Sequence, residues 1–355
     1  MIGNRLKRAR EAKAFSLREL EAAIQGRVTA QAIGKYERDE SMPSSGVLLA
    51  LARTLGVSPE FLMSERPIEL SGVDFRKGPQ AGVKEERAVE AAVLDQVERY
   101  LELEELFPGA DQSWEPPSGP QFSISRIEDA EQAADSLRQL WKLGIDAIPL
   151  MAELLEDKGV KVIALDLPEN ISGSKAFVQR MGRDDVPVIV VNAHHNGERQ
   201  RFTLAHELAH LVLNFVGLND KDQEKAADRF AGAFLMAKEM MVRLLGAHRT
   251  SISLGELVDL KRLFRVSIAS LIVRCSQLEV ISRALYGRIW SQIKDLGWNG
   301  PQSTEPEALE AEVPQRMERM CLRAVAEGAI SEAKASELLG ISVRALDRRL
   351  TPQGA

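Results

Sequence analysis

Three ionisable residues within the segment RFTLAHELAHLVLNF, residues 201–215, could together hold and use a metal ion. His206 and His210 are four residues apart, so their side chains share one face of a helix. Glu207 follows His206 directly. Two imidazoles at this spacing with a glutamate after the first are typical of zinc hydrolases, where the histidines bind the ion and the glutamate acts as a base. The alternative is an ordinary amphipathic helix that carries two of the chain's five histidines.

The apolar residues of the same segment favour the metal site. At about 100° per residue, a helix would place its apolar side chains on the side opposite to the two histidines. These side chains are Leu204, Leu208, Leu211 and Phe215. A histidine of the core would more often lie within that apolar face. The two imidazoles are therefore expected to point away from the core.

A third protein ligand is needed, because a catalytic zinc ion binds three side chains and one water. The following segment, DQEKAADRFAGAFLM, predicts a helix with Glu224 and Asp228 on one face, and the small Ala231 would allow close packing of the two helices. Glu224 would complete a His, His, Glu site for one Zn²⁺ per chain. Asp228 would accept the Nδ1 proton of a zinc-bound histidine, expected to be His206. Taken alone, the two carboxylates would be a solvated acidic face.

The chemistry expected at such a site is hydrolysis of a peptide bond. Zinc lowers the pKa of a bound water to about 7 and polarises the carbonyl, so that Glu207 can remove the water's proton at neutral pH. The same carboxylate can then protonate the departing amine. A donor to the developing oxyanion is also expected, and the sequence does not rank the candidates, which are His194, His195, His248 and Tyr286. The segment NAHH, 192–195, could instead be a plain loop or a second, weaker metal site.

The residues around this site predict a domain of helices with a small sheet. Helical periodicity covers Ile127–Leu143 and Pro149–Lys158, and β-branched runs at 160–167 and 186–192 predict two strands separated by a polar loop, 168–175. Everything after Arg201 is predicted to be helical. The fold class expected for the whole chain is therefore mainly α with a small β-sheet.

The motifs VPVIVVN, RFTLAHELAHLVL and EKAADRFAGAFLM, with LLEDKGVKVIAL upstream, resemble the ImmA/IrrE family of zinc metallopeptidases over residues 124–290. The resemblance implies a gluzincin-like α+β domain that cleaves helix-turn-helix repressors. It also implies zinc ligation by His206, His210 and Glu224, with Glu207 as the general base. The family motif commonly ends in Leu-Met-Pro, whereas this chain has Ala237 at the proline position, a departure that concerns the following loop and substrate specificity rather than the metal.

A second group of residues could contact DNA. Residues 2–63 parse into five short helices, with Ser16 and Thr29 as N-caps, and the short turn QGRV gives a helix-turn-helix arrangement that would expose the third helix. The expected contacts to bases or phosphates are Arg27, Thr29, Ala30, Gln31, Lys35 and Arg38. The alternative is a five-helix protein-interaction module, because the net charge of residues 1–63 is only +3 (ten Lys/Arg against seven Asp/Glu).

The first 63 residues closely resemble the phage-repressor-like, XRE-type helix-turn-helix family of bacterial regulators, in the variant with one extra residue in the turn. The resemblance implies that the chain binds a pseudo-palindromic double-stranded DNA operator as a homodimer. The family pattern usually has glycine where Asp39 stands. Aspartate tolerates left-handed backbone better than most residues, so the turn is expected to survive.

Stretches rich in proline, glycine and serine divide the chain. The expected parts are a helix-turn-helix domain at 1–65, a connecting helix and Pro-rich linker at 66–123, the metallopeptidase domain at 124–295, a linker at 296–315 and a helical tail at 316–355. The connecting helix carries valines at four-residue spacing, so it would pack either on a neighbouring domain or on a second copy of itself.

The tail, CLRAVAEGAISEAKASELLGISVRALDRRL, reads as helix, turn, helix, with Ser342 as a cap and arginines at 344, 348 and 349. It resembles the short helix-turn-helix endings of some toxin–antitoxin regulators. Two readings of it stay open, one as a dimerisation or partner-binding tail and the other as a second DNA contact.

Composition predicts a soluble, cytoplasmic protein without a membrane partner. Hydrophobic residues make up 45% of the chain and charged residues 28%, which is enough for sizeable cores, and the apolar runs are too short to span a bilayer. The N-terminal segment MIGNRLKRAR has no apolar run behind it, so no secretory leader is expected. Cys275 and Cys321 lie outside any CxxC motif, so reduced core thiols are expected.

These observations predict a DNA-binding transcriptional regulator with a zinc-dependent endopeptidase domain that cleaves a repressor or antitoxin protein in a stress, phage or toxin–antitoxin response. One alternative is a non-catalytic, autoregulating antitoxin or repressor that uses the zinc fold as a sensor or as a module binding a cognate toxin. Another is a repressor that presents its own linker, 107–123, to the zinc ion. Glu207 favours catalysis, because a purely structural site has no need of a base.

Overall fold

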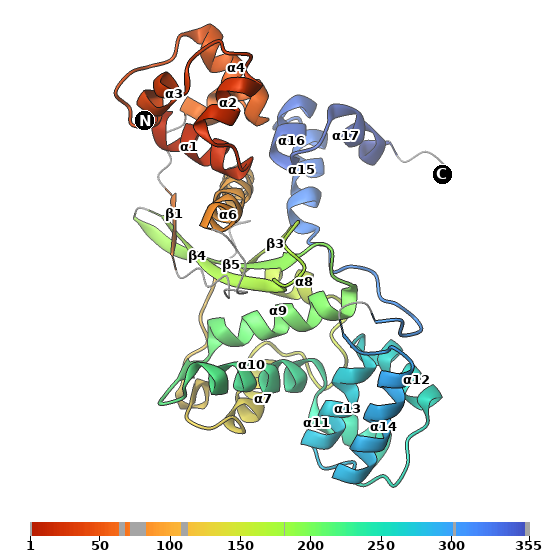
Figure 1. Cartoon of the computed structure of the whole chain (residues 1–355). Helices are drawn as coiled ribbons and strands as arrows, with labels where there is room; N and C mark the ends of the chain where they lie inside the picture. Colours follow the sequence, from red (N-terminus) through yellow and green to blue (C-terminus); the bar gives the residue numbers. More distant parts are fainter. Residues whose placement is uncertain are drawn as a thin grey trace. The chain divides into compact units, whose positions relative to one another are not determined.

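The computed structural model describes residues 2–63, 68–71, 83–107, 113–180, 182–300 and 303–351. The chain is mainly α-helical with a small sheet, as predicted (Figure 1). It divides into two compact units that are described separately below. Unit 1 comprises Met1–Ser113, Ala176–Val188 and Gln315–Ala355, and unit 2 comprises Trp114–Lys175 and Ile189–Pro314. Among the described residues, no helix is long and apolar enough to cross a bilayer.

Unit 1 begins with a bundle of five helices, as the sequence predicts: α1 (Ile2–Ala12), α2 (Leu17–Ala23), α3 (Ala30–Glu37), α4 (Ser45–Leu55) and α5 (Pro59–Met63). Ser16 caps α2 in a capping box with Glu19, and the Thr29 side chain accepts a hydrogen bond from the Ala32 amide at the start of α3. The core of the bundle consists of apolar side chains that include Leu6, Leu20, Ile33 and Leu51.

Asp39 adopts the left-handed backbone expected of it, with φ at 55°. Its Oδ1 accepts a hydrogen bond of 2.9 Å from the Gly3 amide at the start of α1. The aspartate therefore not only tolerates the turn that the family usually forms with glycine but also ties this turn to α1.

The rest of unit 1 consists of β1 (Ile68–Ser71), α6 (Val83–Glu104) and three C-terminal helices, α15 (Arg316–Ala326), α16 (Glu332–Leu339) and α17 (Val343–Leu350). Helix α6 packs against α1, α15 and α16, so its apolar face is used within the chain. Val93 and Val97 of this helix are fully buried, and Glu98 forms a buried salt bridge with Arg5 of α1. We call α15–α17 the C-terminal module.

The sheet has the strand order β1-β4-β5-β3. The outer halves of β4 (Gly173–Arg180) and β5 (Arg183–Asn192) belong to unit 1, where β1 pairs antiparallel with β4 and Ile68 lies opposite Arg180. In unit 2, β5 lies beside β3 (Lys161–Leu165). The continuous buried run of β5, from Val188 to Val191, fits a strand in the middle of a sheet.

Strand β4 differs from the sequence-based prediction, which assigned a loop to residues 168–175. The strand begins at Gly173, where an added Cβ would lie 2.6 Å from the Val190 carbonyl oxygen of β5 and 2.5 Å from the Thr203 side chain. A glycine that permits this approach looks like a loop signal in the sequence. The polar residues after it hide the alternation, in which Ala176 and Val178 are buried and Gln179 is exposed.

Unit 2 also contains β2 (Ser123–Ile124) and β6 (Asn214–Phe215), which pair in parallel, a 3₁₀ turn η1 (Pro120–Phe122), and eight helices among the described residues: α7 (Asp129–Leu140), α8 (Met151–Asp157), α9 (Gly197–Val212), α10 (Asp220–Leu235), α11 (Lys238–Leu245), α12 (Leu254–Phe264), α13 (Ile268–Gln277) and α14 (Arg283–Asp295). The prediction that only helices follow Arg201 is therefore wrong at β6, a short strand between α9 and α10.

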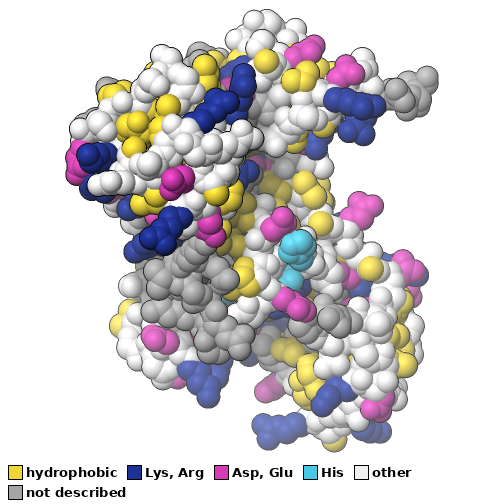
Figure 2. Space-filling view, turned by 45° about the horizontal axis from the view of Figure 1, so that its top comes forward, with side chains coloured by type: hydrophobic (Ala, Val, Ile, Leu, Met, Phe, Trp, Pro, Cys, Tyr) yellow, Lys and Arg dark blue, Asp and Glu magenta, His cyan; other side chains and the backbone are white. Residues whose placement is uncertain are grey.

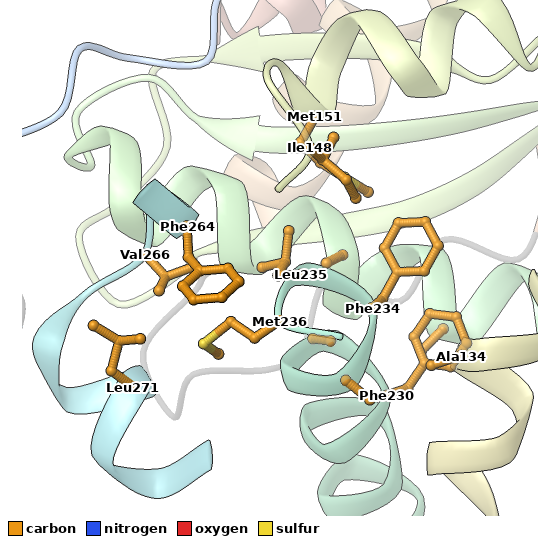
Figure 3. Packing of buried hydrophobic residues seen from close by; sticks show 14 of the residues in the cluster. Ala134, Ile148, Met151, Phe230, Phe234, Leu235, Met236, Phe264, Val266 and Leu271 are labelled. Atoms are coloured by element: carbon orange, nitrogen blue, oxygen red, sulfur yellow. The ribbon is translucent and has the colours of Figure 1, made fainter. Parts of the chain in front are cut away.

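Helix α10 lies between α7 and α9 in the core of unit 2 (Figure 1). Its small buried residues, Ala226, Ala227, Ala231 and Ala233, permit this close packing. Figure 3 shows Phe230 and Phe234 of α10 among the core side chains, and their rings stack with centroids 5.6 Å apart. This core fixes α9 and α10 relative to each other.

Cys275 and Cys321 are free and buried, as predicted. Burial raises the pKa of each thiol to about 11. Both therefore stay protonated at neutral pH and act as small apolar side chains.

Candidate metal centre and nucleic-acid interface

Helix α9 carries the two histidines on a firmly held scaffold. Asn196 caps the helix by accepting a hydrogen bond of 2.9 Å from the Arg199 amide. Leu204, Ala205, Leu208 and Ala209 are fully buried and anchor the helix to the core. The side chains of His206 and His210 are 12% and 10% exposed, so both rings reach the edge of the unit rather than its interior.

The predicted opposite face of this helix needs a correction. Helix α9 ends at Val212, and Phe215 lies beyond it in β6. There the Phe215 ring packs beside His210, with ring centroids 5.5 Å apart. The pairing of β6 with β2 begins at Asn214, so the helix ends before the last of the four apolar residues that were expected to share one face. Phe215 is therefore a neighbour of the candidate site that the sequence analysis placed on the wrong side.

Helix α10 brings Glu224 to the two histidines. The Nε2 atoms of His206 and His210 are 3.3 Å apart. The Glu224 carboxylate oxygens lie 3.6 Å from His206 Nε2 and 3.5 Å from His210 Nε2. Ligand atoms of a tetrahedral zinc ion with bonds of about 2.0–2.1 Å are separated by roughly 3.3–3.4 Å. The three groups could therefore hold a divalent ion with little movement of their side chains.

Asp228, one turn after Glu224, lies beside the first histidine. Its Oδ1 lies 2.8 Å from His206 Nδ1. A carboxylate at this distance accepts the Nδ1 proton and leaves the Nε2 lone pair directed toward His210 and Glu224. The Glu224 side chain is 34% exposed, so the group is open to solvent on one side. An open side is what a catalytic site needs for water and substrate, whereas structural zinc sites are closed.

Glu207 is 6% exposed and lies on the turn of α9 between the two histidines. Its assignment as general base remains a prediction from the motif.

The other candidate residues have contacts elsewhere. His195 Nε2 lies 3.2 Å from the Glu169 carbonyl oxygen, and burial, followed by the nearby Arg199, lowers the pKa of His195. The exposed His194 lies 3.4 Å from Asp166 Oδ1. Among the described residues, the group found with metal-ligand spacing consists of His206, His210 and Glu224, and it includes no residue of NAHH.

The two remaining candidates for the oxyanion donor are Tyr286 and His248, and among the described residues no contact joins either of them to His206, His210 or Glu224. The Tyr286 ring stacks on Trp290, with centroids 5.6 Å apart. His248 lies exposed in the loop between α11 and α12. The donor therefore stays unassigned.

Ala237, which replaces the proline common in the family motif, lies between α10 and α11 as the N-cap of α11. Its φ of −55° is close to the value to which proline is restricted. The φ of Ala237 therefore lies in the range that proline would impose at this position.

The segment predicted as a linker at 296–315 has an unexpected role at its C-terminal end. We call residues 303–314 the strap; it forms no helix or strand but lies against the N-terminal half of α9. A Cβ added to Gly197 would lie 2.0 Å from the Glu310 carbonyl oxygen. Glu312 pairs with Arg201 of α9 at 2.7 Å, and the side chains are 3% and 1% exposed.

A second carboxylate of the strap binds another buried cation. Glu305 lies 2.8 Å from the Nζ of Lys261, which is fully buried and also bonds to Glu198 of α9. Glu312 therefore attaches the strap to the part of α9 that precedes the histidines, whereas Glu305 attaches it to α12, and Lys261 in turn links α12 to α9. The sequence gives little sign of these contacts, because the acidic residues of TEPEALEAE look like those of a solvated linker.

The predicted DNA-contacting residues lie on or beside α3. Arg27, Thr29, Gln31, Lys35 and Arg38 are exposed, and Ala30 is partly buried. Gln31 and Lys35 share the outer face of α3, opposite the buried Ile33. Arg38 bonds to Glu40 at 2.6 Å, a contact that a DNA phosphate would have to replace. On the face drawn in Figure 2, basic and acidic side chains are interspersed and form no broad basic surface.

Comparison with known families matches two parts of the chain. Residues 6–62 match the family described as helix-turn-helix, and residues 155–276 match the peptidase family described as IrrE N-terminal-like domain. The second match contains α9 and α10 and thus His206, Glu207, His210, Glu224 and Asp228. No curated protein matches the chain.

Proposed function

We propose that this chain, which joins an XRE-type helix-turn-helix domain to an IrrE-like peptidase domain, is a DNA-binding regulator whose second domain is a zinc-dependent endopeptidase. The observation that carries the enzymatic half is the convergence of His206, His210 and Glu224, with interatomic distances of 3.3–3.6 Å. Two imidazoles and one carboxylate are the ligand set of many zinc peptidases. The expected substrate is a repressor or antitoxin protein, cleaved in the cytoplasm in response to stress, phage or a toxin–antitoxin imbalance.

A zinc ion at this site would supply a Lewis acid for the scissile carbonyl and would acidify water. Asp228 holds the Nδ1 proton of His206, so this imidazole offers Nε2 as a neutral ligand. Glu207 would take the proton of the attacking water and pass it to the amine nitrogen as the peptide bond breaks. The open side at Glu224 would admit an extended peptide.

Metal analysis of purified wild type, His206→Ala and Glu224→Ala chains tests the ligand set. We expect one zinc ion per wild-type chain after dialysis and less than a tenth of that in either variant, because two protein ligands hold zinc poorly. His194→Ala is the matched control, since this histidine is exposed and outside the group. Equal zinc contents in all four proteins would remove the basis of the proposal.

Glu207→Gln tests catalysis separately from metal binding, because it removes the base and keeps its shape. Cells that produce wild type or Glu207→Gln would be compared by sequencing newly formed protein N-termini before and after stress. We expect cleavage products that depend on Glu207, with zinc content unchanged in the variant. Identical N-termini in both cell populations would instead favour the non-catalytic sensor or antitoxin.

Operator binding by α3 is tested with the double variant Gln31→Ala, Lys35→Ala. Because both side chains lie on the exposed face of this helix, we expect at least tenfold weaker binding to the operator, with the fold intact. Lys221→Ala with Gln292→Ala removes the same residue types from exposed positions of unit 2 and serves as the control. An unchanged gel shift for the α3 variant would contradict the groove assignment. The homodimer implied by a palindromic operator would be measured by sedimentation.

A further inference from the structure

The C-terminal module is a three-helix unit with its own apolar cluster. Cys321 and Ala324 of α15, Ala335 and Leu338 of α16, and Leu346 of α17 are buried together. Leu103 of α6 and Phe107, which follows α6, complete the cluster. The small Ala335 allows the helices to lie close together. The module lies outside both segments that match known families.

Helices α16 and α17 form a helix-turn-helix with a three-residue turn. Helix α16 ends at Leu339, and Gly340 follows in the left-handed conformation, with φ at 66°. Ser342 then caps α17 by accepting a hydrogen bond from the Ala345 amide. A turn of three or four residues that contains glycine is the usual connection in DNA-binding helix-turn-helix motifs.

The second helix of this motif, α17, packs against the module through one face, and its other face is exposed to solvent. Leu346 is the one residue of α17 that is buried, and Leu350 is partly buried beneath it. Positions two residues before and two residues after Leu346 lie on the opposite face, at about 160° and 200° around the helix. These positions carry Arg344 and Arg348, and both side chains are exposed.

The N-terminal helix-turn-helix of the same chain has the same arrangement. In α3 the buried residues are Ile33 and Gly34, and Gln31 and Lys35 stand two positions before and after Ile33. Both second helices begin at a hydroxyl N-cap, Thr29 in α3 and Ser342 in α17. The C-terminal module thus presents two arginines where the assigned DNA-binding domain presents its expected contact residues.

The charge of α17 favours DNA over a protein partner. The helix contains three arginines and one aspartate, a net charge of +2. Arg349 bonds to Glu318 of α15 at 2.7 Å. Among the described residues no ion pair is found for Arg344 or Arg348. Arg348 Nε donates a hydrogen bond of 3.4 Å to the Arg344 carbonyl, which leaves its terminal nitrogens and the Arg344 guanidinium available to a phosphate or to the O6 and N7 atoms of guanine.

We propose that the C-terminal module is a second DNA-binding site of this chain, in which α17 enters the major groove of duplex DNA and presents Arg344 and Arg348 to it. Val343, which is 48% exposed at the start of α17, would contact a thymine methyl group. Two groove-binding helices on one chain would raise its overall affinity for a long duplex, because the second contact forms intramolecularly. The proposal does not depend on the peptidase activity or on operator binding by α3.

The test uses the full chain with α3 disabled by Gln31→Ala and Lys35→Ala. This protein selects duplexes from a randomised 40-bp library, and the affinity for the selected duplexes is measured against salt concentration. We expect an enriched motif, and Arg344→Ala with Arg348→Ala in the same background should weaken its binding at least tenfold. If both arginines contact phosphates, the slope of log affinity against log salt should fall by about 1.8.

Two matched variants separate groove recognition from general charge. Arg243→Ala with Arg288→Ala removes the same charge from exposed positions of unit 2 and should leave binding unchanged. Arg344→Lys keeps the charge but loses the planar fork, so the preference for the motif over random duplex should fall while the salt dependence stays.

Either of two results would overturn the proposal. The first is the absence of an enriched motif in the chain with α3 disabled. The second is equal DNA affinity of the Arg344→Ala, Arg348→Ala chain and its control. A change in oligomeric state on sedimentation, with DNA affinity unchanged, would identify α17 as a self-association surface and would reject DNA as its partner.

Discussion

At the level of single residues, the hydrogen bond between Asp228 and His206 leads us to expect that zinc affinity depends on Asp228. Asp228→Asn keeps the size of the side chain but loses the charge that favours the Nδ1-protonated, Nε2-ligating imidazole. We expect zinc affinity to fall about 10- to 100-fold, as is usual when such a partner of a metal-bound histidine is lost. Competition with a fluorescent chelator measures it.

A control for this prediction lies on the same helix. Asp222, in the first turn of α10, pairs with Lys225 at 2.9 Å rather than with a histidine. Asp222→Asn should leave zinc affinity unchanged. If Asp228→Asn behaves like this control, the aspartate has no part in orienting the ligand.

The grouping of His206, His210 and Glu224 agrees with the prediction from the sequence, because helix periodicity fixes which side chains share a face. His206 and His210 are one turn apart, and Glu224 and Asp228 repeat that spacing on the next helix. Phe215 could not be placed, since its position depends on where α9 ends. That end is set by the pairing of β6 with β2, a contact across about 90 residues that no local pattern contains.

At the level of elements, we expect a substitution in the strap to lower the free energy of unfolding strongly, although the strap contains no residue of the candidate metal centre. Glu312→Gln would leave the buried guanidinium of Arg201 without its carboxylate. Removal of one partner of a buried ion pair costs about 3–5 kcal/mol. We expect the free energy of unfolding to fall by that amount in urea denaturation.

The neighbouring glutamate provides the comparison. Glu310 is exposed, so Glu310→Gln should change the unfolding free energy by less than about 0.5 kcal/mol. Similar values for the two variants would mean that the strap does not stabilise α9.

The helices were easier to predict than the sheet. Helices with an N-cap and a periodic apolar pattern, such as α2, α3 and α10, can be recognised from about ten residues of sequence. Strand β4 depends on partners from β1 and β5, and the close approach at Gly173 that makes the pairing possible resembles a turn in the sequence. The sequence predicts a linker where the strap lies for a similar reason, because Arg201 and Lys261, to which the strap binds, are distant in the sequence.

At the level of the whole molecule, the two units predict where the chain can be cut. A fragment of residues 114–314 retains the strap, whereas a fragment of residues 114–302 would bury Arg201 without Glu312 and would deprive Lys261 of Glu305. We expect a cooperative thermal transition for the longer fragment and aggregation or a much lower transition temperature for the shorter one. Calorimetry and gel filtration of both decide the question, and equal stability would count against unit 2 as described.

Unit 1 is assembled from the beginning, the middle and the end of the chain. During translation, Leu103 and Phe107 therefore leave the ribosome more than 200 residues before Cys321 and Leu338, which cover them in the finished protein. Until residues 321–346 have been made, this apolar surface lacks its cover and is a hazard for aggregation. A chain that stops before residue 316 should therefore give a lower yield of soluble protein, even though every residue of the candidate metal centre has been made.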